Sequence, residues 1–124
     1  MKIPNHPIPG RLWIVHLAEL VSNRVRSRIQ NWPANDRDRL GDQLLRSIDS
    51  IGVNIAEGYA RFHVRERLHF YSIAQGSIEE SIRHITRARH RGLLSPLESF
   101  TFFELLVKLS KSLDRFGDKQ TSRI

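Results

Sequence analysis

The chain of 124 residues contains no cysteine, and it also lacks long apolar runs. Without cysteine, neither a disulfide framework nor a zinc site built on cysteine is possible. No apolar run approaches the roughly 20 residues that a membrane-spanning helix needs. The N-terminal residues MKIPNHPIPG contain prolines and a histidine where a secretory signal peptide needs an unbroken apolar core. We therefore expect a cytoplasmic protein with no membrane partner.

Acidic residues are outnumbered, with 13 Asp and Glu against 20 Lys and Arg, and the formal net charge is +7. The excess comes mostly from arginine, whose planar fork of donors suits phosphate and carboxylate groups. Such a charge favours attraction to polyanions without identifying one of them. Hydrophobic residues make up 40% and charged residues 27% of the chain, which is a globular composition. The length fits one domain, residues 1–124, with its own core.

Hydrophobic periodicity predicts helices throughout, because apolar residues recur at spacings of three and four. No alternating pattern typical of strands competes with this prediction. Four helices joined by short connections indicate an all-α fold, an antiparallel up-and-down four-helix bundle. We expect residues 1–10 to form an N-terminal arm and residues 117–124 a polar tail. The predicted helices run from Leu12 to about Ile29, from Arg37 to Ala60, from Arg65 to Arg91, and from Pro96 to about Phe116.

Helix ends can also be predicted from single residues. Asn35 or Asp36 is a suitable N-cap for the second helix. Gly92 suits the position that follows the C-terminus of the third helix. The segment Ser95-Pro96-Leu97-Glu98 has the pattern of a capping box with proline at the first helical position. The boundary before the fourth helix is therefore the clearest in the chain.

The stretch from Gln43 to Ser95 carries small and polar residues where a plain bundle would carry leucine. Each glycine inside a helix costs about 1 kcal/mol relative to alanine, so Gly52 and Gly58 indicate close helix packing. Buried polar residues fix the register of two helices at some cost in stability. We expect the following residues to face inward: Ser47, Ser50, Gly52, Asn54, Ala56, Glu57, Gly58, Ala74, Gln75, Gly76, Ser77 and Glu80.

Catalytic and metal-binding patterns are weak. A di-metal bundle needs two Glu-x-x-His motifs and further glutamates, and only Glu66 to His69 matches this motif. Glu66 also lies in the first turn of its helix, where an acid is favourable without a metal. The serines of the central stretch fall inside helices and lack the Gly-x-Ser-x-Gly context of a nucleophile. We expect no enzymatic activity, no metal and no cofactor.

Two arginine clusters at predicted helix C-termini are the candidate functional surface. Arg83, Arg87 and Arg91 lie on one stripe, with successive residues about 6 Å apart along the helix axis. Cations at helix C-termini also offset the helix dipole, so a solvated or subunit-interface role is the alternative. No helix-turn-helix, RNA-recognition or zinc-finger pattern is present, so phosphate contacts are the expected mode of binding. The predicted nucleic-acid-binding residues are Arg83, Arg87, Arg89, Arg91, Arg24, Arg26 and Arg28.

The motif residues of the central stretch run Gln43, Arg46-Ser47, Ser50-Ile51, Asn54-Ile55-Ala56-Glu57-Gly58 and Arg61, then Ala74-x-Gly76-Ser77-x-x-Glu80 and Gly92-x-Leu94-Ser95. This pattern resembles the bacterial four-helix-bundle family of proteins encoded in 23S rRNA intervening sequences. That family is related to the accessory proteins of diversity-generating retroelements. The resemblance implies a cytosolic, ring-like homopentamer with no established enzymatic activity. For the retroelement relatives it implies a basic surface that binds nucleic acid and a reverse transcriptase.

The resemblance also assigns roles to the motif residues, which look like fold and interface positions. Independently of it, Glu57 and Arg61 have the spacing of an ion pair on one helix face. A recognition site at one end of the bundle, made by Asn54 and Glu57, is the alternative. The predicted structural motif comprises Asn54, Glu57, Gly58, Arg61, Gly76, Ser77 and Glu80.

Two functions follow from these observations. The first is a non-enzymatic, oligomeric bundle whose basic surface binds RNA or DNA through phosphate contacts. The second is a protein-interaction or scaffold module whose arginine-rich faces form subunit or partner interfaces. A cryptic enzyme is a third class, and it would need a concave pocket with perturbed titratable groups.

Overall fold

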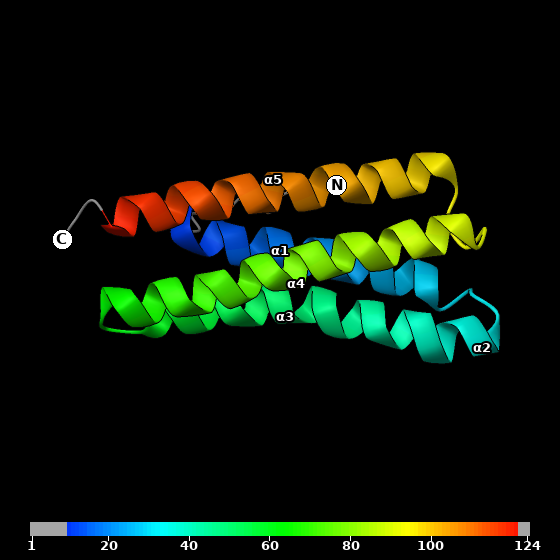
Figure 1. Ribbon diagram of the computed structural model, residues 1–124, viewed down its shortest axis with the longest axis horizontal. Coiled ribbons are helices and arrows are strands. Elements are labelled where there is room, and N and C mark those ends of the chain that lie inside the picture. The colour runs from blue at the N-terminus through cyan, green and yellow to red at the C-terminus, as the bar shows by residue number, and fades with distance from the viewer. Residues whose placement is uncertain (1–9, 122–124) are drawn as a thin grey trace.

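Apolar residues at helical spacing give each of four long helices one buried stripe, and the stripes meet in a bundle (Figure 1). The computed structural model describes the backbone of residues 10–121 and the side chains of residues 13–117. Within the described backbone there is no strand. The predicted antiparallel four-helix bundle is confirmed. Its long helices are α1 (Gly10–Ile29), α3 (Asp42–Ala60), α4 (Val64–His90) and α5 (Pro96–Thr121).

The second long helix begins earlier than predicted. Before α3, the short α2 (Ala34–Asp36) and a π-helical turn, η1 (Arg37–Gly41), continue into it without a break. The prediction of Asn35 or Asp36 as the N-cap is wrong, because both residues already lie inside the helix. Pro33 precedes the first turn at φ −52° and ψ 144°, and its carbonyl oxygen accepts the N–H of Arg37 at 2.8 Å. The proline ring fixes φ and so directs the chain into the helix.

The boundary between α4 and α5 has the predicted geometry. Gly92 has φ +74° and follows the last turn of α4, where the left-handed conformation favours glycine. The Ser95 hydroxyl accepts the N–H of Glu98, and the Glu98 carboxylate accepts the N–H of Ser95, each at 3.1 Å. The capping box is therefore confirmed. It sets the point at which the chain turns back along α4.

At the two chain ends the helices are longer than the sequence pattern suggested. α5 continues past Phe116 to Thr121, so residues 117–121 of the expected polar tail are helical. Phe116 is buried, and a Cβ added at Gly117 would lie 3.7 Å from Leu68 of α4, so helix packing extends this far. α1 begins at Gly10, which is the last residue of the expected arm. The rest of the arm and residues 122–124 lie outside the described residues.

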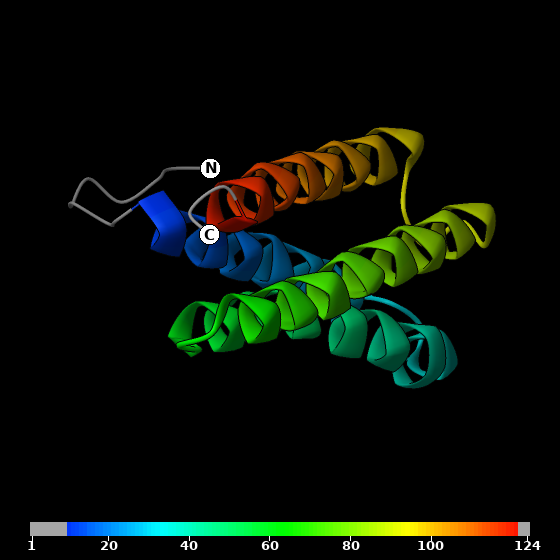
Figure 2. The same cartoon turned by 60° about the vertical axis from the view of Figure 1, so that its left-hand side comes forward.

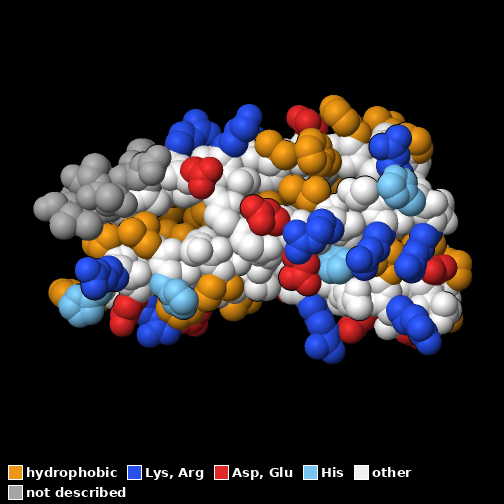
Figure 3. Space-filling model, viewed as in Figure 1, with side chains coloured by type: hydrophobic (Ala, Val, Ile, Leu, Met, Phe, Trp, Pro, Cys, Tyr) orange, Lys and Arg blue, Asp and Glu red, His pale blue; other side chains and the backbone are white. Residues whose placement is uncertain are grey.

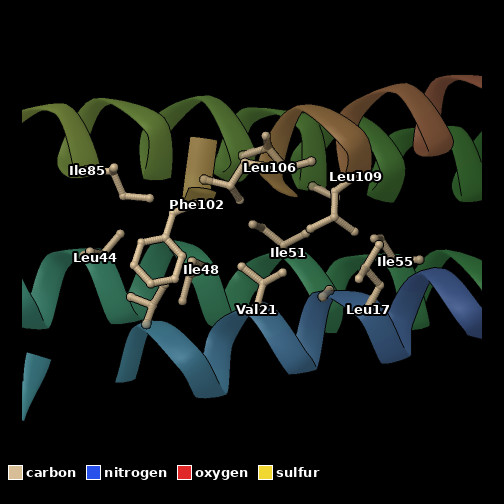
Figure 4. Packing of buried hydrophobic residues seen from close by; sticks show 14 of the residues in the cluster. Leu17, Val21, Leu44, Ile48, Ile51, Ile55, Ile85, Phe102, Leu106 and Leu109 are labelled. Atoms are coloured by element: carbon tan, nitrogen blue, oxygen red, sulfur yellow. The ribbon is translucent and has the colours of Figure 1, made fainter. Parts of the chain in front are cut away.

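The core is one continuous cluster between the four long helices. α1 packs against α3 and α5, and α4 packs against the same two helices, so α1 and α4 lie diagonally across the bundle. The diagonal arrangement is visible when Figure 1 and Figure 2 are compared. Figure 4 shows Val21 of α1, Ile51 of α3 and Leu106 of α5 converging on the centre. All three side chains are fully buried.

Candidate nucleic-acid interface

Polar motif residues of the central stretch meet where α3 packs against α4. The hydroxyl oxygens of Ser47 and Ser81 are 2.8 Å apart, and those of Ser50 and Ser77 are 2.9 Å apart. The Asn54 amide donates to the Ser50 hydroxyl at 2.9 Å and to the Ser50 carbonyl at 2.8 Å. Sliding one helix along the other would break the two serine–serine hydrogen bonds, which supplement bonds from Ser47, Ser77 and Ser81 to carbonyl oxygens of their own helices. Both Asn54 bonds go to Ser50 of its own helix, so in the single chain Asn54 supports the Ser50–Ser77 pair.

The motif glycines differ in their surroundings. A Cβ at Gly58 would lie 2.6 Å from Cε1 of Tyr71, whereas at Gly52 it would make an ordinary contact with Ala18 at 3.5 Å. Gly76 is exposed, and a Cβ there would have no neighbour within 4 Å. Gly58 is thus required for the close approach of α3 and α4. The prediction that Gly76 faces inward is wrong, because a turn of about 100° per residue carries it away from buried Ala74.

The motif acids also lie on the surface. Glu57 accepts a hydrogen bond from Arg61 at 3.2 Å, as their spacing predicted. Glu80 lies 3.4 Å from Nε2 of buried His84. Glu57, Glu80 and Ala56 are exposed, so the prediction that they face inward is wrong. Carboxylates stay in water because burial without a partner is costly.

Both arginine clusters lie at one end of the bundle. α1 and α4 run toward this end, and α3 and α5 run away from it (Figure 1 and Figure 2). Because α1 and α4 are diagonal to each other, their outer surfaces face opposite sides of the bundle. The residues of the two clusters therefore share an end without forming one patch.

Three of the seven predicted phosphate contacts are arginines that are paired with carboxylates of other helices. Each pair joins two elements that are distant in sequence, so these arginines take part in packing as well as in surface charge. The pairs are Arg26 with Asp49 at 2.8 Å, Arg28 with Glu98, and Arg91 with Asp36 at 3.9 Å. The Asp49 carboxylate also accepts a hydrogen bond from the Ser22 hydroxyl.

The other four predicted arginines are exposed and have no ion pair within the described part of the chain. Arg83, Arg87 and Arg89 belong to the C-terminal half of α4, and Arg24 belongs to α1. Arg83 and Arg87 are one helical turn apart, so both project from the same side of α4. Figure 3 shows basic side chains gathered over the C-terminal half of α4 and the adjoining part of α3. Because these arginines have no carboxylate partner within the described side chains, this surface is, among the predicted residues, the one best able to form new charge contacts.

Glu98 holds one of the paired arginines in place. Its pKa lies below the ordinary value of 4.5, chiefly because the Ser95 N–H bonds the carboxylate and also because Arg28 is positively charged. Partial burial acts in the opposite direction. The carboxylate is therefore ionised at neutral pH and keeps Arg28 engaged at the start of α5.

Two exposed phenylalanines near the start of α5 were not among the predicted site residues. Phe100 is 61% exposed and Phe103 is 42% exposed. They border a hollow of about 250 Å³ between α4 and α5. The sequence could have indicated this exposure, because Phe100 and Phe103 fall beside the apolar stripe of Phe102, Leu106 and Leu109 and not on it. The residues that line the hollow are Ile82, Ile85, Thr86, Arg89, Ser99, Phe100 and Phe103.

Other kinds of site find little support in the described residues. Glu66 and His69, which form the single Glu-x-x-His motif, are both exposed at the start of α4. Among described side chains, no group of three or more histidines and acids is placed to hold a metal ion. None of the helices in residues 10–121 combines the length and apolar character needed to cross a membrane.

The architecture defines the chain as a four-helix-bundle protein of the antiparallel class, with arginine-rich helix ends at one pole. A family model described as the 23S rRNA-intervening sequence protein matches residues 11–115, a span that includes parts of all four long helices. The chain belongs to this family. No curated protein matches the sequence.

Proposed function

We propose that this protein is a cytoplasmic, non-enzymatic RNA-binding bundle that contacts phosphates through the outer surface of α4. The observation that carries the proposal is the pair of exposed arginines Arg83 and Arg87 on one side of α4, with exposed Arg89 on the side that faces α5; none of the three has an ion pair in the described residues. The family description contains a ribosomal RNA, which favours RNA over DNA as the polyanion. The cytoplasm is the compartment in which this protein would encounter ribosomal RNA.

The ion pairs narrow the predicted set of phosphate contacts. A phosphate that approached Arg26 or Arg28 would compete with Asp49 or Glu98, which already hold these guanidinium groups. An unpaired arginine instead exchanges solvent and counterions for the phosphate, and release of those counterions favours binding. We therefore assign the phosphate contacts to α4, with Arg24 as a weaker contact on the opposite side of the bundle.

Charge reversal on α4 tests the proposal. The Arg83→Glu/Arg87→Glu variant should lose at least about tenfold in RNA affinity at low salt, and its affinity should depend less on salt. The matched control is Lys111→Glu/Arg115→Glu, which removes two exposed cations at the same spacing from the far half of α5. Filter binding across a salt series, from about 50 to 200 mM, gives both affinity and slope.

Three results would contradict the proposal. They are no RNA binding by the unaltered protein at low salt, equal losses in the two variants, or unchanged binding by the α4 variant. Circular dichroism of both variants confirms that the helices are intact, so a loss of affinity can be assigned to the surface.

A protein-interaction module is the second candidate function, and a different face supports it. A groove of about 560 Å³ runs between α1 and α3, and small side chains such as Ala18, Gly52 and Ala56 line it. Val53 borders this groove and is 60% exposed. An exposed apolar residue beside a groove of small residues is a surface that a helix of another subunit could cover. The homopentamer implied by family resemblance would need such a face, because a closed ring joins two different surfaces of each copy.

Light scattering tests this second function. A homopentamer has five times the 14.4 kDa mass of the chain. Ala56→Trp, which fills the groove, should then reduce the mass, and the α4 charge variant should reduce it if arginine-rich faces form the interfaces. A monomer at all concentrations would exclude the ring. A reverse transcriptase is a further proposed partner, and co-purification with such an enzyme would test it.

A further inference from the structure

We propose that the face between α4 and α5 binds single-stranded RNA, with bases stacked on Phe100 and Phe103 and phosphates on the arginines of α4. This inference rests on the proposed RNA-binding function and adds the kind of RNA that is bound. It gives a role to Phe100 and Phe103, which take no part in the phosphate contacts.

The two rings lie together on the solvent side of the bundle. Phe100 and Phe103 are three residues apart, so they are neighbours on the surface of α5. Both border the hollow between α4 and α5, and Arg89 lines the opposite wall. Figure 3 shows hydrophobic side chains gathered over the N-terminal half of α5, next to the basic side chains over α4. An aromatic surface and a cationic surface therefore adjoin each other at this end of the bundle.

This combination is the one that single-stranded nucleic acids require. A basic track follows the backbone, and aromatic rings stack on the bases, with little dependence on sequence. The hollow has a volume of about 250 Å³, below the range of about 300–1,000 Å³ that is usual for enclosed small-molecule sites. Its size and its open aromatic rim suit planar bases that stack against the wall better than a ligand that is enclosed.

The charges of the hollow favour a nucleic acid over a second copy of the chain. Arg89 lines the hollow, and no carboxylate is among the lining residues. A protein surface that covered the hollow would have to desolvate Arg89 and supply a carboxylate for it. A duplex would meet the arginines, but its bases are stacked inside and cannot cover the phenylalanine rings. Unpaired RNA satisfies both surfaces at once.

Replacing the rings while keeping their apolar character tests the stacking. Phe100→Leu/Phe103→Leu should lower the affinity for a short oligouridine by at least about fivefold, because a leucine cannot stack. Its affinity for an RNA duplex of equal length should change by less than about twofold, because phosphate contacts alone hold the duplex. The matched control is Phe62→Leu, at an 87% exposed phenylalanine in the connection between α3 and α4. Fluorescence anisotropy with the two labelled RNAs measures all affinities.

Each alternative to the stacking site predicts a different result in the binding and light-scattering measurements. If the double leucine variant binds the oligouridine as well as the unaltered protein does, or weakens both RNAs equally, the stacking site is wrong. If the variant instead changes the mass in light scattering, a second copy covers this face and the inference is overturned. Binding of the duplex alone would refute the stacking site and leave the phosphate surface intact. An absence of binding to both RNAs would refute the proposed function as well.

Discussion

Two helical glycines of the central stretch, Gly58 in the last turn of α3 and Gly76 in the middle of α4, have opposite surroundings in the fold. Gly58 lies against the ring of Tyr71, and Gly76 lies in open solvent. Alanine is the better helix former at both positions by about 1 kcal/mol. Any difference between the two alanine variants therefore reports on packing.

Gly58→Ala is expected to lower the free energy of unfolding by about 1–3 kcal/mol, as overpacking does. The added Cβ would lie 2.6 Å from Cε1 of Tyr71 and 3.0 Å from the carbonyl oxygen of Arg67, and neither backbone nor ring can move freely. Urea denaturation followed by circular dichroism measures the change. Gly76→Ala is the control and should raise the stability by up to about 1 kcal/mol. A stabilising Gly58→Ala would show that α3 and α4 are less closely packed than described.

The lowered pKa of Glu98 predicts a pH dependence at the start of α5. A carboxyl group whose pKa is lower in the folded state stabilises the fold above its unfolded value, and this contribution is lost as pH falls through the folded pKa. Glu98→Gln should thus be less stable than the unaltered chain by about 0.3–1 kcal/mol at pH 7. The difference should shrink below the ordinary value of 4.5 and vanish at lower pH.

Denaturation with urea at a series of pH values measures this difference. Glu104→Gln is the control, because Glu104 is exposed and has no ion pair within the described side chains. A Glu98→Gln difference that stays constant with pH would show that the carboxylate charge is not the source of the stabilisation.

Among whole elements, each neighbouring pair of long helices is joined by at least one polar contact in addition to the apolar core. The charged and amide groups of these contacts lie at the edges of the buried stripes, where a side chain can reach both a partner and water, whereas Ser22, Ser47 and Ser81 are buried. These contacts restrict sliding and rotation that an apolar interface alone would tolerate. The contacts are Ser22 and Arg26 with Asp49 for α1 and α3, Ser47 with Ser81 for α3 and α4, Gln75 with Ser110 for α4 and α5, and Arg28 with Glu98 for α1 and α5.

The buried pair of Ser47 and Ser81 is suited to a double-mutant cycle. Each single alanine variant should lose about 0.5–1.5 kcal/mol, because the remaining hydroxyl loses a partner. The double variant should lose less than the sum of the two, since the single hydrogen bond between the two hydroxyls is removed in each single variant but can be lost only once. Thr101→Ala, whose hydroxyl bonds only the Leu97 carbonyl of its own helix, is the control and should change stability little. Simple additivity in the cycle would show that the two serines contribute independently.

At the scale of the whole molecule, one core joins all four long helices, and no second cluster is set apart from it among the described side chains. Unfolding of a small domain with a single core is expected to be cooperative. Trp32 is buried close to the end of α1, at the pole that carries the arginine clusters, and half-buried Trp13 lies near the start of α1, so tryptophan fluorescence reports on both ends of the bundle.

Leu109→Ala should therefore lower the stability of the whole bundle by about 2–5 kcal/mol, because the Leu109 side chain is fully buried in the core. Tryptophan fluorescence and circular dichroism should show the same shifted midpoint. Separate midpoints for the two probes would show that the bundle does not unfold as one unit. Val107→Ala, at a half-buried neighbour on α5, is the milder control.

Two faces of the bundle also differ in function under our proposals. Arginines without partners and exposed phenylalanines lie at the pole where α4 ends and α5 begins, on adjacent helices. The groove of small residues lies between α1 and α3, on the opposite side of the bundle. RNA binding and subunit assembly can thus use different faces of one small chain.

The sequence by itself determined the helices, their order and the bundle class, because these depend on local properties. Stripes such as Ile14 to Ile29 follow from helical periodicity, and the Ser95–Glu98 capping box involves residues three positions apart. The motif from Gln43 to Ser95 likewise identified the family, because it is a pattern along the chain. Local rules failed at the start of the second helix, where the carbonyl of Pro33 completes the first turn.

Only the tertiary structure decided which arginines are available and which motif residues are buried. Arg26 meets Asp49 across 23 positions of sequence, and Gly58 approaches Tyr71 only after α3 and α4 have packed. The juxtaposition of Arg89 with Phe100 and Phe103 also arises from the packing of α4 against α5. Such contacts depend on the rotation and register of whole helices, which buried side chains from all four long helices set together.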